Sequence, residues 1–311
     1  MVTAESAERW MQGMLMFLCL IIATTAGAQV EISFANKVLF TKTGDMDGVR
    51  LAVLLPAPVT NEYQEISALH SNCGKFYTIS ENKKVLYYAG TFDGPTLPIV
   101  ETFVYKSKPV IIDFSQKNNK NVIPGTEPND YLDSDGKYIN LKNKTIRSLG
   151  DSLWNVSKDT IDYARRCYEY VATHFKYIKV GNWRTLSEII KKGGGECGDF
   201  STVFITLMRY KGIPARHNMG VKTDGSYHVW ADFYHTDYGW IPVDVTYKNS
   251  NPKGDFFGVY RGGLIILSQG FTTFSRPDLN IRNYPLQTFY YKYWYQSGYG
   301  SVEGHHEPSK Q

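Results

Sequence analysis

The sequence predicts an α+β protein, in which an antiparallel β-sandwich precedes a mixed core of helices and strands. Three observations lead to this prediction. Residues 29–114 show short alternating apolar runs, helical periodicity begins only after a polar stretch that ends near residue 140, and strand patterns return after the helices. With 311 residues, the chain is long enough for two ordinary domains.

The predicted strands of residues 29–114 alternate apolar and polar side chains, with turn clusters such as TGDMDG and SENKK between them. The runs are VEISF, VRLAVLL, KFYTIS, KVLYYAG, IVETFVY and PVIIDF. Short strands at this spacing are typical of a β-sandwich. The region holds no cluster of catalytic residue types, and we interpret the isolated His70 as a structural or surface residue.

Residues 115–140 are rich in Asn, Asp, Pro and Gly, and we expect them to form a linker. Residues 141–311 would then form the second domain, with a β-rich extension at its C-terminal end. The first clear helical pattern spans residues 160–177, where one apolar stripe contains Ile161, Ala164, Tyr168, Val171 and Phe175. Cys167 flanks this stripe, so we expect it to be a small buried residue.

Composition and charge exclude several classes of protein. Apolar residues make up 42% of the chain and charged residues 21%, which excludes an intrinsically disordered chain. Lys and Arg number 34 against 30 Asp and Glu, and no long basic run occurs. A nucleic-acid-binding protein would concentrate its positive charge on one face or helix, so we expect no nucleic acid as partner.

The N-terminus carries an export signal. Residues 15–23 read LMFLCLIIA, and Ala26-Gly27-Ala28 fits the small-x-small rule for cleavage before Gln29. This run is too short for a transmembrane helix, which needs about 20 apolar residues. We therefore expect residues 1–28 to be a cleaved signal peptide and the mature protein to be soluble and either secreted or periplasmic; a buried N-terminal helix is the alternative.

Cleavage after Ala28 would leave three cysteines, Cys73, Cys167 and Cys197. An odd number in an oxidising compartment means that at least one thiol is unpaired or pairs between chains. The leftover thiol requires an explanation, and one of the three lies in a segment with the features of a catalytic nucleophile.

That segment is GGGECGDFSTVFITLMRYKGIPAR, residues 193–216. Apolar residues from Phe200 onward have the spacing of a buried helix face, so Cys197 is predicted in the first turn of a core helix. The three preceding glycines allow a tight turn that brings backbone amides close to the sulfur. The positive end of the helix dipole favours a thiolate. A cysteine that is only packed in the core needs neither feature.

A base for this cysteine is predicted in YHVWADFYHTDYGWIPVDVTY, residues 227–247. The pattern predicts a β-hairpin, with His228 on the less apolar face of the first strand. If Tyr234 pairs with Tyr238, His228 lies opposite Asp244, and directly opposed Cβ atoms are about 5 Å apart. Pro242 removes one ladder donor, so we expect an edge strand or an irregularity in the returning strand.

A helix-borne Cys followed by a hairpin-borne His–Asp pair resembles the transglutaminase-like superfamily. The matching pieces are GGGECGDFS, the helix that ends in GIPAR, HVWADFY and WIPVDVT, within residues 141–250. The resemblance implies a papain-like α+β core with Cys197 as nucleophile, His228 as base and acid, and Asp244 as the residue that orients the histidine. Secreted bacterial proteins of this type often carry a β-domain before the core, as residues 29–140 would.

Two features of the family carry over less well. Animal transglutaminases place an upstream Trp near the oxyanion, whereas here only Trp183 and Tyr177 are available, so the Cys197 backbone N–H is the safer oxyanion donor. The calcium sites of those enzymes have no matching acidic cluster, and we expect no metal or cofactor. Asp199 and Arg216 fit the family pattern, but a helix cap and a salt bridge would explain them equally well.

The remaining histidines are weaker candidates. We expect His217 on a strand surface, His235 in the hairpin loop, and His305 and His306 in a polar C-terminal tail. Residues 256–270 read as further strand structure that closes the sheet. Residues 289–300 are unusually aromatic, and packing on the core is the favoured interpretation over a cleft wall.

These residues predict an exported cysteine-dependent enzyme that cleaves amide bonds through an acyl-enzyme, with a peptide, a protein or cell-wall peptide as substrate. Hydrolysis, as in a peptidase or amidase, is favoured over protein cross-linking. The second alternative is a non-catalytic binding module that retains the fold. The sequence leaves the oligomeric state open.

Overall fold

A computed structural model describes residues 31–116 and 128–310 of the chain. It confirms the α+β class, with mostly antiparallel sheets and a β-rich N-terminal region. The predicted signal peptide, residues 1–28 with its cleavage site, and residues 117–127 of the predicted linker lie outside the described residues. Within the described ranges, no helix combines the length and the apolar character needed to cross a bilayer.

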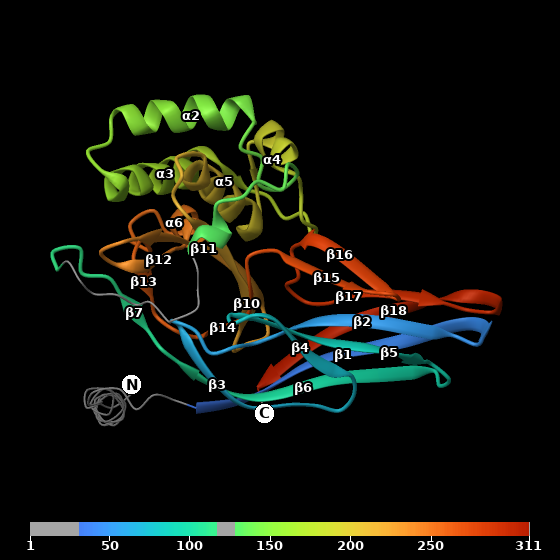
Figure 1. The fold of residues 1–311 in the computed structure, drawn as a ribbon. Helices are drawn as coiled ribbons and strands as arrows, with labels where there is room; N and C mark the ends of the chain where they lie inside the picture. Colours follow the sequence, from blue (N-terminus) through green and yellow to red (C-terminus); the bar gives the residue numbers. More distant parts are fainter. Residues whose placement is uncertain (1–30, 117–127, 311) are drawn as a thin grey trace, which may run out of the picture. The chain divides into compact units, whose positions relative to one another are not determined.

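Two four-stranded antiparallel sheets form a sandwich (Figure 1). The first sheet has the order β18(Ser297–Lys310), β1(Glu31–Asp47), β6(Thr96–Ser107), β3(Gln64–Ser71). The second has the order β17(Tyr290–Trp294), β2(Arg50–Ala57), β5(Lys83–Thr91), β4(Lys75–Ser80). Alternate side chains of the two sheets meet in one buried apolar layer that includes Val38, Phe40, Leu51, Val53 and Leu86. The period-two pattern of the sequence therefore corresponds to this layer.

The C-terminal residues are strands of the sandwich. β18 pairs with β1 from Lys310 opposite Phe34 to Ser297 opposite Asp47, and β17 pairs with β2. The prediction of a polar tail that contains His305 and His306 was therefore wrong. An outer strand such as β18 is held by backbone hydrogen bonds, and its solvent-facing side chains need not be apolar, so the strand left little hydrophobic signal.

A buried polar pair lies within the first sheet. Asn36 on β1 and Glu101 on β6 are cross-strand neighbours without solvent exposure, and Asn36 Nδ2 donates to Glu101 Oε2 over 2.8 Å. Burial raises the pKa of the Glu101 carboxyl to about 8, although the hydrogen bond from Asn36 lowers it. Glu101 therefore holds a proton at neutral pH in the folded protein, where an unfolded chain would release it.

This shift predicts that Glu101→Gln stabilises the protein at alkaline pH. The folded pKa lies above the ordinary value of 4.5, so wild-type stability falls as pH rises from about 4.5 to about 8 and stays reduced above it. The variant lacks this titration and can still accept from Asn36. Urea unfolding gives the free energy of unfolding of both proteins at pH 5 and at pH 9. The difference, variant minus wild type, should be larger at pH 9 than at pH 5 by at least about 1 kcal/mol, the free energy that corresponds to one pKa unit. The same difference in free energy of unfolding at both pH values would contradict the raised pKa of Glu101.

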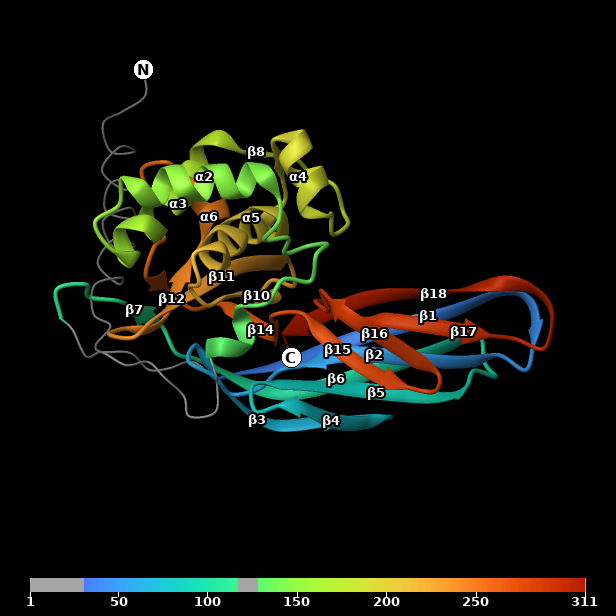
Figure 2. The same cartoon turned by 45° about the horizontal axis from the view of Figure 1, so that its top comes forward.

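The second part of the fold is a four-stranded antiparallel sheet with helices over one face (Figures 1 and 2). Its strand order is β12(Gly239–Val243), β11(Tyr227–His235), β10(Ala215–Lys222), β14(Leu264–Gln269). The helices are α2(Lys144–Asn155), α3(Thr160–His174), α4(Leu186–Lys192), α5(Cys197–Tyr210) and α6(Val245–Ser250). The α5 helix packs on β10 and β11, and α2 and α3 pack on α5. β12 is an edge strand of this sheet, as Pro242 predicted.

Short elements complete the fold: β7(Val110–Ile111), η1(Pro128–Tyr131), β8(Lys176–Tyr177), β9(Gly194–Gly195), β13(Val259–Tyr260), β15(Thr272–Arg276) and β16(Leu279–Tyr284). β14 pairs with β10, so residues 256–270 do close the sheet. The strand β3, which the sequence patterns missed, carries an exposed His70. Its side chains alternate weakly, because most of them face solvent.

The two predicted helices bury the expected faces, but the first ends at His174 and not at residue 177, because Lys176–Tyr177 form β8. Asp159 caps α3 by accepting from the Asp162 backbone N–H over 2.8 Å, and Cys167 is fully buried in the helical core. The α5 helix starts at Cys197 and buries every residue from Asp199 to Met208. Helix α5 is therefore fixed on several sides, and its N-terminal residue has a defined position.

A buried ionic cluster joins the sandwich region to the second sheet. Arg216 on β10 is fully buried between Glu62 and Asp232, at 3.0 Å and 3.1 Å respectively. The Tyr63 hydroxyl donates to Asp232 over 3.0 Å, and the Arg216 guanidinium lies 3.9 Å from the centre of the Trp240 ring. Of the two interpretations of Arg216, the salt bridge is the one that the structure confirms.

Candidate active site

The three glycines before Cys197 allow the chain to turn and to approach other groups closely. Gly193 has φ of +63°, a left-handed conformation that ends α4. A Cβ on Gly194 would lie 2.0 Å from the Lys176 carbonyl oxygen, and one on Gly195 would lie 2.0 Å from Asp199 Oδ2. This close approach lets β9 pair with β8 and leads the chain into α5.

Cys197 is the first residue of α5, and its side chain is partly exposed. Asp199 Oδ2 accepts from the Glu196 backbone N–H over 2.9 Å and from Arg184 over 2.8 Å. The interpretation of Asp199 as a helix cap and salt-bridge partner is thus confirmed. Because the N-terminus of α5 carries partial positive charge, this position favours a thiolate.

His228 and Asp244 form a buried pair beside this helix end. The His228 Nε2 to Asp244 Oδ2 distance is 2.5 Å, and both residues are buried. Asp244 is also the N-cap of α6, where its Oδ1 accepts from the Tyr247 backbone N–H over 2.9 Å. The Tyr247 ring stacks on the imidazole at 4.6 Å. The carboxylate and the ring are therefore held in one orientation.

The charge state of His228 depends on its two neighbours. Burial acts to lower the pKa of the imidazole, but the Asp244 carboxylate and a hydrogen bond with Cys197 outweigh it and raise the pKa to about 10. The structure thus brings together the three residues that the sequence predicted. At neutral pH the imidazole therefore carries a positive charge beside the N-terminal residue of α5.

The predicted hairpin register was wrong. Tyr234 pairs with Trp240 and not with Tyr238, and β12 ends at Val243. The strand residues of this hairpin therefore pair two positions away from the prediction. His228 nevertheless reaches Asp244, because the chain leaves the sheet at that residue and turns into α6.

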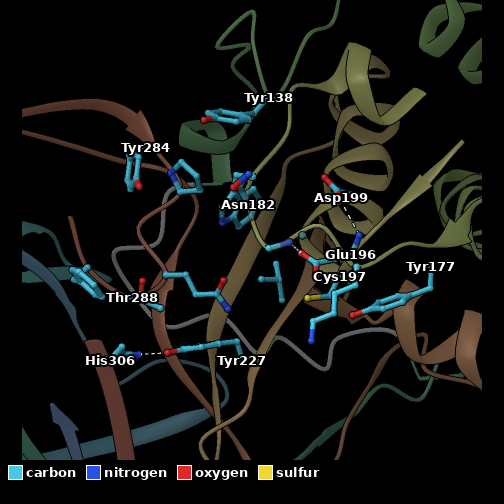
Figure 3. A pocket seen from close by; sticks show the side chains of 18 residues that line it. Tyr138, Tyr177, Asn182, Glu196, Cys197, Asp199, Tyr227, Tyr284, Thr288 and His306 are labelled. Atoms are coloured by element: carbon cyan, nitrogen blue, oxygen red, sulfur yellow. Dashed lines mark hydrogen bonds between the residues drawn. The ribbon is translucent and has the colours of Figure 1, made fainter. Parts of the chain in front are cut away.

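The partly exposed Cys197 opens onto a pocket of about 810 Å³ (Figure 3). One side comes from the segment around Trp183 and from the start of α5, and the opposite side from β11 and the C-terminal strands. Aromatic rings dominate the lining: Tyr138, Tyr177, Trp183, Tyr227, Tyr284 and Phe289. A Cβ on Gly198 would lie 3.1 Å from the Trp183 ring, so this indole packs directly on the first turn of α5.

Some residues around the site had no local signal in the sequence. Gln287 Nε2 donates to the backbone oxygens of His228, over 3.3 Å, and Gly220, over 3.2 Å. His217 was expected on a strand surface, but it is fully buried against Phe271 and contacts Thr202 Oγ1 at 3.0 Å. The expectation was wrong because the face of β10 that carries His217 is covered by α5 and the segment around Phe271.

The three cysteines of the described residues, Cys73, Cys167 and Cys197, are free thiols. Burial raises the pKa of the Cys167 thiol to about 12 and raises that of Cys73 as well. Neither of these two lies beside a histidine base. Cys197 alone combines partial exposure with an imidazole neighbour.

The fold and this site define a cysteine-containing α+β domain with a histidine–aspartate pair, and comparison with known proteins shows what this domain is similar to. Residues 147–245 match the model of the transglutaminase-like superfamily. Cys197, His228 and Asp244 all lie within the matched residues. The match is to a family of cysteine-dependent enzymes. Among curated proteins, none matches the chain.

One solved structure extends the likeness of the fold beyond this domain. A Cytophaga hutchinsonii protein proposed to be a cysteine protease is 14% identical, with a TM-score of 0.61 and 91% of each chain covered. It shows that the fold is shared over both the sandwich and the helical part. The periplasmic domain of TgpA from Pseudomonas aeruginosa, bound to ethylmercury, is 15% identical, with 74% of this chain and 80% of that one covered and a TM-score of 0.36. LapG from Legionella pneumophila is 17% identical, with 46% and 88% covered and a TM-score of 0.32.

Proposed function

We propose that this protein is an exported cysteine hydrolase that cleaves amide bonds of peptides or proteins through Cys197, His228 and Asp244. The observation that carries the proposal is the His228–Asp244 pair, with 2.5 Å between Nε2 and Oδ2, beside a cysteine at the N-terminus of α5. Asp244 occupies Nε2, so Nδ1 is the ring nitrogen left to face the sulfur. The apolar run at residues 15–23 supports export.

In this mechanism, the Cys197 thiolate attacks the carbonyl carbon of a peptide bond and forms a C–S bond. The backbone N–H of Cys197 is the proposed donor to the resulting oxyanion. The His228 imidazolium gives its proton to the leaving nitrogen, the C–N bond breaks, and a thioester remains. The neutral imidazole then takes a proton from water as the water attacks the thioester carbon; the C–S bond breaks, which releases the acid and restores the Cys197 thiolate and the His228 imidazolium.

Selective alkylation tests the activated thiolate on which the proposal rests. Iodoacetamide at pH 6 should modify Cys197 well before Cys73 or Cys167, because the thiolate is the reactive species and the imidazolium stabilises it. Peptide mapping by mass spectrometry identifies the modified residue. Equal or slower modification of Cys197 relative to Cys73 would contradict the proposal and favour a binding module.

The pH profile should report His228 and its dependence on Asp244. The imidazolium must donate a proton, and its pKa is raised to about 10, so kcat/KM should hold up to that range and then fall. In Asp244→Asn the carboxylate charge is lost, and the single amide oxygen can accept from the Tyr247 backbone N–H or from His228 Nε2 but not from both. The alkaline limb should then move to lower pH by at least about one unit, since Coulomb attraction to Asp244 is the largest of the raising causes. An unchanged alkaline limb would contradict the role of Asp244.

A further inference from the structure

A chain of hydrogen bonds runs from the pocket into the interior of the sandwich. The Tyr227 hydroxyl, on β11, is hydrogen-bonded to His306 Nδ1 on β18, and His306 Nε2 is hydrogen-bonded to Asn36 Oδ1 on β1. Asn36 Nδ2 then donates to the buried Glu101 on β6 over 2.8 Å. Tyr227 and His306 both line the pocket that contains Cys197, and Figure 3 shows the bond between them.

The direction of this chain follows from its buried end. Asn36 uses its amide N–H groups as donors to Glu101, so its Oδ1 accepts and His306 Nε2 must carry the proton. Burial lowers the pKa of His306 to about 4, and a neutral imidazole with a protonated Nε2 has an unprotonated Nδ1. Tyr227 is therefore the donor to Nδ1. Burial raises the pKa of the Tyr227 phenol, which keeps this proton in place.

Because its only hydroxyl proton is committed to His306, Tyr227 has only oxygen lone pairs left for other partners. Its side chain is 44% exposed, which leaves room for a ligand to reach this oxygen. The ring cannot easily turn away, since it stacks on the His306 imidazole with 5.4 Å between centroids and 17° between planes. The pocket therefore has a fixed hydrogen-bond acceptor on the wall made by β11 and β18.

We propose that Tyr227 is a substrate-binding residue whose phenolic oxygen accepts a hydrogen bond from a backbone N–H of a peptide in the pocket, and that His306 and Asn36 are positioning residues for it. The role rests on the proposed function, because it assigns the peptide substrate of the same site. A backbone N–H is the donor that every extended peptide presents regardless of its side chains. The aromatic lining supplies apolar surface around it.

Two thiol-modifying probes separate this role from the chemistry of Cys197. Methyl methanethiosulfonate forms a mixed disulfide as methanesulfinate leaves, and it has no N–H group. N-acetyl-tripeptidyl chloromethyl ketones, ending in Ala, Phe or Gln, form a thioether as chloride leaves, and each can be made with one backbone nitrogen methylated. The measured quantities are kinact/KI for the ketones and the second-order rate for the small reagent, each at Cys197.

We expect Tyr227→Phe to lower kinact/KI about tenfold through KI, the effect of one hydrogen bond, and to leave the rate with methyl methanethiosulfonate unchanged. Methylation of one particular backbone nitrogen of the ketone should lower kinact/KI about tenfold in wild type and less than about twofold in Tyr227→Phe. His306→Phe keeps a ring for stacking but frees the Tyr227 hydroxyl. We therefore expect this variant to lower kinact/KI by raising KI as well. Tyr299→Phe makes the same change at a tyrosine that is 75% exposed and outside the pocket, and it should behave as wild type.

The proposal is overturned if Tyr227→Phe reacts with the ketones as wild type does, or if N-methylation costs the same in both proteins. A parallel fall with both kinds of probe would also overturn it, since it would show general damage to the site. Failure of wild-type Cys197 to react with either probe would instead contradict the proposed function, and the role of Tyr227 would fall with it. The two failures are thus distinguishable.

Discussion

Cys197→Ser should lower kcat/KM for an amide substrate by at least about 10⁴-fold. A serine hydroxyl is nearly isosteric, but it does not ionise near neutral pH as a thiol beside an imidazolium does. Because the pKa of His228 is raised to about 10, its imidazole is protonated on both ring nitrogens near neutral pH, and no base is available to activate the hydroxyl. The measurement is turnover of a fluorogenic peptide library, with thermal unfolding to show that the variant is folded.

Cys73→Ser provides the matched control, because it makes the same change at a free thiol in the sandwich. We expect its activity to equal that of wild type. Full activity in Cys197→Ser would contradict the enzymatic mechanism. A Cys197→Ser variant that still binds peptides, in a protein whose wild type shows no turnover, would support the binding module.

The same peptide library shows whether water or an amine takes the acyl group from the thioester. Addition of a primary amine such as putrescine diverts the thioester to an amide if amines compete with water. We expect the free acid to remain the main product in a hydrolase. An amide product at low amine concentration would instead identify a cross-linking enzyme, with the same nucleophile and the same dependence on Cys197.

The residues of the candidate site were predictable because each carries a local signal. The glycines and the apolar helix face mark the position of Cys197, and the alternating strand pattern marks His228. The period of the side chains predicted α3, α5 and several of the strands, and the glycines before Cys197 predicted where α5 begins. These are properties of a few neighbouring residues, so one sequence is enough to read them.

The contacts between distant segments were not predictable in this way. The register of the β11–β12 hairpin depends on the turn conformation around His235, and residue types alone did not determine it. Tyr227 and His306 are 79 positions apart, and His306 lies in a strand with little apolar pattern. One wall of the pocket is made by such residues, which explains why the sequence indicated a candidate nucleophile but not the surface that would hold a substrate.

Arg216→Met should lower the free energy of unfolding by about 3–5 kcal/mol, the usual cost of removing one partner from a buried ionic cluster. Glu62 and Asp232 would remain buried without their cation. Even in wild type, burial raises the pKa of Asp232 to about 6, although Arg216 acts to lower it. Without Arg216, the Asp232 carboxyl should titrate at higher pH. The loss measured by urea unfolding should therefore be smaller at pH 5 than at pH 8, since protonation in the folded state relieves the unpaired charge.

Arg165→Met is the matched control for this variant. Arg165 pairs with Asp255 at 2.6 Å, but the two side chains are 34% and 56% exposed, so we expect a loss of less than about 1 kcal/mol. Adding Glu62→Gln and Asp232→Asn to Arg216→Met should recover part of the loss by removing the two buried charges. A loss that did not depend on pH, or that the added changes failed to reduce, would show that the packing of Arg216 on Trp240 is what stabilises this region. If the charges are responsible, this cluster links the sandwich to the strands that carry His228 and Tyr227, and the geometry of the site depends on the sandwich being present.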